Sequence, residues 1–137
     1  HRDLHKEYRR QRQMCIRDSL ATMAMVPRAL TAATQLAREG IDVEVVDPRT
    51  LRPLDEETIL ESVRKTNRLV IVHEAWQKGG FGAEVSALVV EKAFDYLDAP
   101  IQRVGARDVP MPYNDGLELE VIPSIERIAN TIREVMR

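Results

Sequence analysis

The sequence predicts an α/β fold with three layers, in which a mostly parallel open sheet lies between two layers of helices. Residues 69–72 are four aliphatic residues without polar alternation, which is typical of a strand covered on both faces. A turn that contains Gly79, Gly80 and Gly82 follows, and apolar residues with helical spacing begin at Phe81. Because a buried strand, a turn and a helix make up half of a βαβ unit, a parallel sheet is expected.

The rest of the chain alternates strands and helices in the same way. Pro27 suits the first turn of a helix, where its missing N–H would have no partner, and Gly40 can end that helix in a left-handed conformation. Asp55 can cap the next helix. Strands are predicted at residues 20–24, 41–46, 69–72 and 100–104; helices begin near residues 27, 55, 81 and 125, the third ends at about residue 97, and residues 105–122 form a loop.

The length and composition indicate one globular domain. At 137 residues the chain can bury one core of ordinary size. Its single cysteine, Cys15, excludes an internal disulfide framework and favours a reducing compartment, and no Cys/His cluster has the spacing of a zinc site. No apolar run reaches the roughly 20 residues that span a bilayer, and the basic N-terminus lacks the apolar core of a signal peptide. We therefore expect a cytoplasmic protein that binds neither metal nor membrane.

Residues 1–19 differ in charge from the rest of the chain. This segment is rich in Lys and Arg, whereas residues 20–137 carry more Asp and Glu than Lys and Arg. A basic arm of this kind can bind nucleic acid. Residues 13–19, however, resemble translated sequencing adapter, so a non-native extension is favoured and no nucleic-acid partner is expected. The predicted organisation is a non-native or disordered extension over residues 1–19, followed by one domain over residues 20–137.

The sharpest candidate for chemistry is the pair His73 and Glu74, at the carboxyl end of the third predicted strand. Open α/β sheets bind ligands at this edge. Neighbouring strand residues point to opposite faces, however, so the two side chains should not serve one substrate, and a structural histidine is favoured over a ligand contact. The turn through Gly79, Gly80 and Gly82 lacks the G-x-G-x-x-G spacing of dinucleotide sites, and glycine at the entry to a tightly packed helix explains it as well as phosphate binding does.

Several large apolar side chains fall where an isolated domain should be polar. Trp76 and Phe81 flank the glycine turn, and Met111 and Tyr113 lie between prolines or beside them in the predicted loop. In addition, the helix that begins at Phe81 is apolar over most of its circumference. These residues form either an interface with another subunit or a part of this domain's own core, and both alternatives stay open.

Long motifs distributed over the chain, in a fixed order, carry a family resemblance. They are residues 21–30, 40–55, 73–84, 94–100, 104–113 and 122–128. Together they resemble the C-terminal domain of the beta subunit of thiamine-diphosphate-dependent 2-oxoacid dehydrogenases, a family that acts on pyruvate, branched-chain 2-oxoacids or acetoin. The resemblance covers roughly residues 20–137 and implies a transketolase C-terminal-like fold with strands in the order second, first, third, fourth. It also implies an N-terminally truncated fragment, since the pyrimidine-binding domain and the antiparallel edge strand that the family carries upstream are not found.

The resemblance implies an assembly domain of a larger enzyme. In the intact family enzyme, thiamine diphosphate and Mg²⁺ bind to other domains, so this chain is expected to bind no cofactor and to supply no catalytic or metal-binding residue. The implied partners are the alpha subunit, a second beta subunit and the dihydrolipoyl acyltransferase core. In that complex the domain would support oxidative decarboxylation of a 2-oxoacid with acyl transfer to lipoyl groups. The alternative is a free-standing α/β enzyme or nucleotide-binding domain that uses His73, Glu74 and the turn from Gly79 to Gly82.

Overall fold

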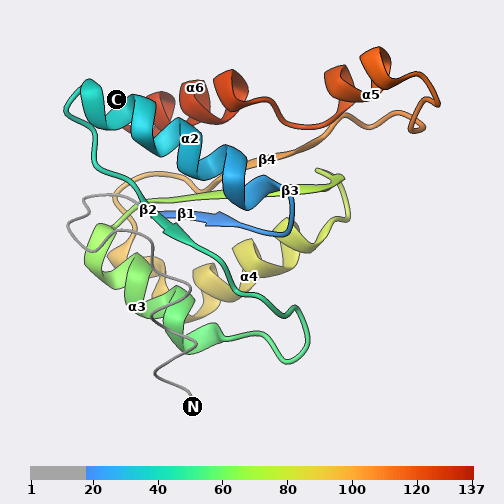
Figure 1. The fold of residues 1–137 in the computed structure, drawn as a ribbon. Helices are drawn as coiled ribbons and strands as arrows, with labels where there is room; N and C mark the ends of the chain where they lie inside the picture. Colours follow the sequence, from blue (N-terminus) through green and yellow to red (C-terminus); the bar gives the residue numbers. More distant parts are fainter. Residues whose placement is uncertain (1–17) are drawn as a thin grey trace.

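The computed structural model describes residues 18–137, and its centre is a parallel sheet (Figure 1). The strands are β1 (Asp18–Ala21), β2 (Glu44–Val46), β3 (Leu69–Trp76) and β4 (Gln102–Ala106). They lie in the order β2-β1-β3-β4, and each neighbouring pair is parallel. Both the predicted α/β fold class and the predicted strand order are confirmed.

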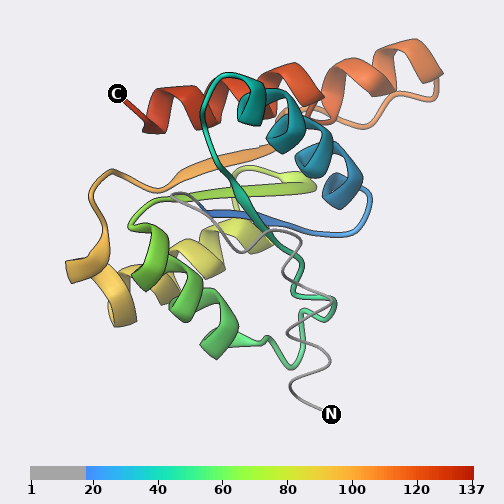
Figure 2. The same ribbon diagram turned by 60° about the vertical axis from the view of Figure 1, so that its left-hand side comes forward.

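Helices cover both faces of the sheet. Helices α2 (Met25–Arg38) and α6 (Ile125–Val135) lie on one face, while α3 (Glu56–Thr66), α4 (Phe81–Ala93) and the short 3-10 helix η1 (Phe94–Tyr96) lie on the other (Figures 1 and 2). Strand β3 supplies residues to both layers, because alternate side chains point to opposite faces. Val70 and Val72 pack against α2 and α6, whereas Leu69 and Ile71 pack against α3 and α4.

Local signals in the sequence account for where the helices begin and end. The carboxylate of Asp55 accepts a hydrogen bond from Thr58 N and so caps α3, which ends at Asn67 in the left-handed conformation. Ser124 caps α6 by accepting from Arg127 N. Gly40, just beyond α2, has a φ of 81°, which suits glycine. No helix among the described residues is long and apolar enough to cross a membrane.

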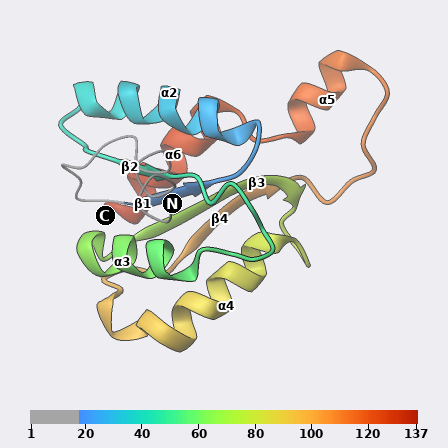
Figure 3. The ribbon, with the colours of Figure 1, turned by 60° about the horizontal axis from the view of Figure 1, so that its bottom comes forward.

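The structure differs from the predicted elements in the second half of the chain. The predicted loop at residues 105–122 contains a helix, α5 (Asp115–Val121), because the Asn114 side chain caps it by accepting from Gly116 N and Leu117 N. Figure 3 shows α5 standing away from the rest of the domain. The helix predicted to reach residue 97 ends at Ala93 and continues as η1, and β3 extends to Trp76, beyond the predicted end at residue 72.

The domain start predicted at residue 20 falls inside strand β1. Asp18 and Ser19 belong to β1, where they pair with β2 and with β3, so the last two residues of the predicted extension form part of the central sheet. The prediction for residues 1–17 lies outside the described residues. At the other end, β1 stops at Ala21, before the predicted residue 24, because Met23 adopts a φ of 50° and α2 begins at Met25.

Two buried serines provide a matched test of the packing. Ser19 is fully buried, and its Oγ has no hydrogen-bond partner among the described residues, whereas Ser62 Oγ donates to the buried carboxylate of Glu44 at 3.0 Å. We predict that Ser19→Ala raises the free energy of unfolding by about 1 kcal/mol, because it removes an unsatisfied polar group. Ser62→Ala should lower it by about 1–3 kcal/mol, because it leaves a carboxylate oxygen without this donor. Urea unfolding of both variants measures this, and a loss of stability in Ser19→Ala would contradict the assignment.

Candidate functional site

An irregular stretch of β3 shapes the carboxyl edge of the sheet. Val72 pairs with Val104 and Trp76 pairs with Ala106, so residues 73–75 of β3 lie opposite Gly105 alone. This is a β-bulge, and bulges commonly redirect side chains near the rim of a sheet. Here the bulge carries both predicted site residues, His73 and Glu74.

The His73 side chain points into the domain and is only 3 % exposed. Its Nδ1 lies 3.0 Å from the carbonyl oxygen of Ala75. Because a carbonyl can only accept, Nδ1 carries the proton and Nε2 is the unprotonated nitrogen. Nε2 is buried and has no hydrogen-bond partner among the described residues.

Three glycines make room for this imidazole. A methyl group added at Gly82 would overlap Nε2 and Cδ2 of His73, and one added at Gly105 would lie 2.9 Å from Cε1. One added at Gly80 would lie 3.0 Å from Cε1 and would also overlap the carbonyl oxygen of Trp76. The glycine turn therefore lets helix α4 and strand β4 pack closely around the histidine ring. This close packing explains why glycine occupies positions 80 and 82, and no phosphate ligand is needed to explain it. Gly79 has a different role, because its φ of 65° makes the turn itself.

Burial also disfavours the charged form of His73. Desolvation lowers the pKa of this histidine below its ordinary value; the hydrogen bond to Ala75 opposes the shift, and the positive charge of Arg103 adds to it. Arg103 itself donates from Nη1 to the carbonyl oxygen of Gln77 at 2.7 Å, which ties β4 to the start of the glycine turn. A neutral, enclosed ring is poorly placed to exchange protons with a substrate, so the geometry supports the structural role for His73.

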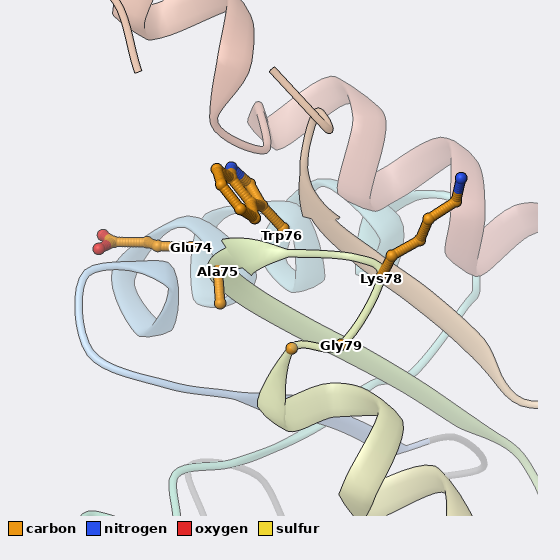
Figure 4. A pocket seen from close by; sticks show the side chains of 6 residues that line it. Glu74, Ala75, Trp76, Lys78 and Gly79 are labelled. Carbon is orange, nitrogen blue, oxygen red and sulfur yellow. The ribbon is translucent and has the colours of Figure 1, made fainter. Parts of the chain in front are cut away.

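Glu74 lies on the outer surface, so the structure does not bring the two site candidates together. Glu74, Trp76, Lys78 and Gly79 instead border a shallow hollow of about 330 Å³ at the carboxyl edge (Figure 4). The Glu74 and Lys78 side chains extend in different directions from it, and Lys78 Nζ lies 3.6 Å from Asp108 Oδ2. Within residues 18–137, no group of three or more His, Cys, Asp or Glu side chains could hold a metal ion.

The four predicted interface residues divide into two groups. Trp76, Met111 and Tyr113 are exposed, Trp76 by 53 % and Tyr113 completely. Phe81 is half-buried and packs against the core beneath α4. For this residue, packing within the domain is therefore the alternative that the structure supports. Met111 and Tyr113 belong to a projecting segment, residues 107–121, that we call the arm; it comprises the loop after β4 and helix α5.

Two exposed apolar residues on the arm, Leu117 and Leu119, escaped the sequence prediction because a loop rather than a helix was expected there; Leu119 is 60 % exposed. On α4 and η1, Val90 and Phe94 are exposed, Phe94 by 65 %. The apolar circumference predicted for this helix therefore includes a face that lies outside this domain's own core.

The contact between His73 and Gly82 can be tested by a double-mutant cycle. Gly82→Ala should lower the free energy of unfolding by about 1–3 kcal/mol, because the added methyl group overlaps the ring in a packed core. The same substitution in a His73→Ala background should cost less by at least ~1 kcal/mol, because the ring is gone. Gly116→Ala, on α5 and away from His73, is the control; its methyl group would lie 3.2 Å from Asn114 Oδ1, so its effect should be the same in both backgrounds. Equal costs of Gly82→Ala in both backgrounds would show that the ring and the glycine do not compete for space.

The lowered pKa of His73 makes stability depend on pH. The ordinary pKa is 6.5, and the folded-state pKa lies below it, so below about pH 6.5 the unfolded chain binds a proton that the folded chain does not. The contribution of His73 to stability is thus present above pH 6.5 and is lost as the pH falls toward the folded-state pKa. Chemical unfolding at a series of pH values should show this decline, and His73→Asn should reduce it in that window. An unchanged pH dependence in the variant would refute the assignment.

Comparison with known proteins identifies the family of this chain. Residues 12–128 match the family described as "Transketolase, C-terminal domain". The chain is 50 % identical to the mitochondrial pyruvate dehydrogenase E1 component subunit beta of Dictyostelium discoideum over 111 residues, which cover 81 % of this chain and 31 % of that protein. It is 49 % identical to the corresponding subunit of Rickettsia felis over 110 residues, covering 80 % of this chain and 34 % of that protein. The chain thus spans about a third of the length of these relatives.

Two solved structures share the fold. A split-gene transketolase, described as an inactive beta4 tetramer, aligns with a TM-score of 0.74 at 28 % identity and covers 87 % of this chain and 37 % of that one. A transketolase mutant from Pichia stipitis aligns with a TM-score of 0.62 at 18 % identity, covering 92 % of this chain and 17 % of that one, which is evidence for the fold alone. With the family match over most of its length, this chain belongs to the transketolase C-terminal domain family.

Proposed function

We propose that this chain is an assembly domain of a pyruvate dehydrogenase beta subunit and that it binds other subunits rather than substrate. The observation that carries the proposal is the concentration of exposed large apolar side chains on the arm, where Val109, Met111, Tyr113, Leu117 and Leu119 are all exposed. Monomeric domains rarely expose apolar side chains in such clusters, and clusters of this kind mark binding surfaces. Its relatives are named as beta subunits of pyruvate dehydrogenase, which supports partners of this general kind.

The second apolar face of α4 supports the same function. Val90, Phe94, Leu97 and Ile101 border an open hollow of about 500 Å³ on the side of the domain away from the arm. A helix that packs one face on its own sheet and exposes an apolar face has room for a second neighbour. Two separate apolar surfaces fit a domain that lies between subunits, and the split-gene transketolase with a similar fold is described as a tetramer of beta subunits.

The names of the relatives and the exposed apolar surfaces support other subunits as the partners. We propose the alpha subunit and a second beta subunit as the immediate neighbours, and the dihydrolipoyl acyltransferase core as a further partner in the intact complex. The substrate, a 2-oxoacid whose acyl group passes to lipoyl groups, would be bound and processed outside this domain. A cytoplasmic location stays a prediction, and the Dictyostelium relative is named as a mitochondrial protein.

We propose that thiamine diphosphate is bound outside the described residues. In the part of the chain that the structure describes, no group of three or more His, Cys, Asp or Glu side chains could hold a metal ion. The nearest alternative, a phosphate at the glycine turn, competes with the packing of His73 against Gly80 and Gly82. We predict that calorimetric titration of this chain with thiamine diphosphate and Mg²⁺ gives no saturable heat. Micromolar binding, which corresponds to roughly 8 kcal/mol, would contradict this part of the proposal.

A free-standing enzyme or nucleotide-binding domain is the less favoured function. It would need His73 or the glycine turn to face a ligand, but the ring is buried and the glycines pack against it. Within residues 18–137, exposed Glu74 has no buried partner that would orient it as an acid or base. The shallow hollow beside Trp76 is open.

Tyr113 and Phe81 form a matched pair for testing the assembly role. Tyr113 is fully exposed on the arm, so Tyr113→Ser should leave the melting temperature nearly unchanged and weaken subunit assembly by about 2 kcal/mol or more if the residue is a hot spot. Phe81 packs on the core, so Phe81→Ala should lower stability by about 3 kcal/mol. Assembly is measured by capture of a co-expressed pyruvate dehydrogenase alpha subunit, and stability by thermal melting. Unchanged capture by Tyr113→Ser would show that this residue lies outside the interface.

A further inference from the structure

The side chain of Arg127, in the first turn of α6, is a cation without a partner. Within residues 18–137 its guanidinium group forms no ion pair, and Nη1 is buried without a hydrogen-bond acceptor. The other two side-chain nitrogens remain open to solvent. A buried nitrogen that carries charge is costly when no hydrogen bond replaces its lost hydration. The natural counterpart of this group is an anion.

Arg107 brings a second guanidinium group to the same place. Its backbone N–H donates to the carbonyl oxygen of Val121 at 3.0 Å, which holds the start of the arm close to the Ser124 cap of α6. Burial lowers the pKa of Arg127, and the positive charge of Arg107 lowers it further, so the two guanidinium groups are close enough to repel each other. An anion that contacts both groups would relieve this repulsion.

The start of α6 adds to the positive potential. Arg28 on α2 donates from Nη1 to the carbonyl oxygen of Pro123 at 2.6 Å, so a third guanidinium group lies beside the first turn of α6. Helices α2 and α6 begin at the same end of the domain (Figure 1). The N-terminal end of a helix favours negative charge, because its N–H dipoles point toward it. The helix ends and the arginines therefore favour the same kind of ligand.

Two carboxylates limit where this ligand can lie. Glu120 and Arg107 both line a hollow of about 290 Å³ on the arm, and Glu126 precedes Arg127 on α6. Both glutamates are exposed, and neither lies within ion-pair distance of the two arginines. An anion fits best between the guanidinium groups, on the side of Arg107 away from Glu120. The rest of the hollow is apolar and is lined by Val109, Pro110, Pro112 and Leu117.

A dianion matches two adjacent guanidinium groups better than a single carboxylate does. A phosphate group carries a charge of about −1.5 to −2 near pH 7 and offers several acceptor oxygens. Arginine binds such groups through two parallel N–H donors, so one phosphate can contact two arginines at once. A carboxylate carries one negative charge and would leave one positive charge without a counterpart.

We propose that Arg107 and Arg127 form a binding site for a phosphate group. The group is either free phosphate or a phosphate monoester whose apolar part lies in the neighbouring hollow of the arm. This site is separate from the glycine turn and does not depend on the proposed assembly function.

Titration of the 137-residue chain with inorganic phosphate tests the site, at an ionic strength held constant with sodium chloride. The ¹H–¹⁵N NMR signals of the Nε–H groups of Arg107 and Arg127 should shift and saturate, with a dissociation constant of about 1 mM. This is about a thousandfold weaker than the micromolar binding that would contradict the thiamine diphosphate prediction. Arg107→Gln and Arg127→Gln should each raise the dissociation constant at least ~10-fold, because each removes a charged pair of donors.

Three further measurements establish specificity and the source of the phosphate. Arg38→Gln, an exposed change at the other end of α2, should leave the dissociation constant unaltered, whereas Glu120→Gln should lower it by removing a negative charge next to Arg107. Sodium acetate should bind at least ~10-fold more weakly than phosphate, because it carries one charge. Phenyl phosphate distinguishes the sources: tighter binding than inorganic phosphate identifies a monoester, and equal binding identifies free phosphate.

Thermal melting without phosphate checks that the variants are folded. Arg127→Gln should not lower the melting temperature, because it removes a buried charge without a partner; if it does, Arg107→Gln, at an exposed position, provides the same binding test. Arginine signals that respond to phosphate no more than to chloride overturn the inference. So does phosphate binding that persists unchanged in the Arg107→Gln variant.

Discussion

The packing of the His73 ring against Gly80, Gly82 and Gly105 fixes the carboxyl edge of the sheet. Through this ring, the bulge of β3, the entry to α4 and the end of β4 are in direct contact. Any larger residue at Gly82 would meet the ring, and any shift of the bulge would move the Ala75 carbonyl that holds Nδ1. The positions of the exposed Trp76 hollow and of the arm, which leaves β4 just after Gly105, depend on this arrangement.

This constraint determines what the edge can do. Open α/β sheets usually bind ligands at this edge, where loops diverge. Here the space between β3 and the start of α4 is filled by an enclosed imidazole, so packing occupies the place where a ligand would lie. The exposed apolar groups lie further out, on the arm and on the outer face of α4. This division supports the proposed binding role.

The sequence predicted the elements whose determinants are local and missed those that depend on distant contacts. The unbroken aliphatic run at residues 69–72 identified the central strand, and strand alternation predicted that His73 and Glu74 diverge. The role of Gly105 could not be predicted, because its contact with His73 joins residues far apart in the chain. Helix α5 was missed because its cap, Asn114, follows two prolines closely and only one of its residues, Val121, is buried. Ser19 entered the sheet although its segment resembles foreign sequence, since strand pairing at an end depends on the backbone more than on the side chain.

The tautomer and charge of His73 are the most direct test of this account. Long-range ¹H–¹⁵N NMR correlation of the imidazole distinguishes protonation at Nδ1 from protonation at Nε2 and follows both with pH. We predict a neutral ring protonated at Nδ1 that keeps this form as the pH falls through about 6.5, the ordinary pKa of histidine. A ring protonated at Nε2, or one that titrates with a midpoint near 6.5, would place the imidazole in contact with solvent and contradict the central role assigned to its packing.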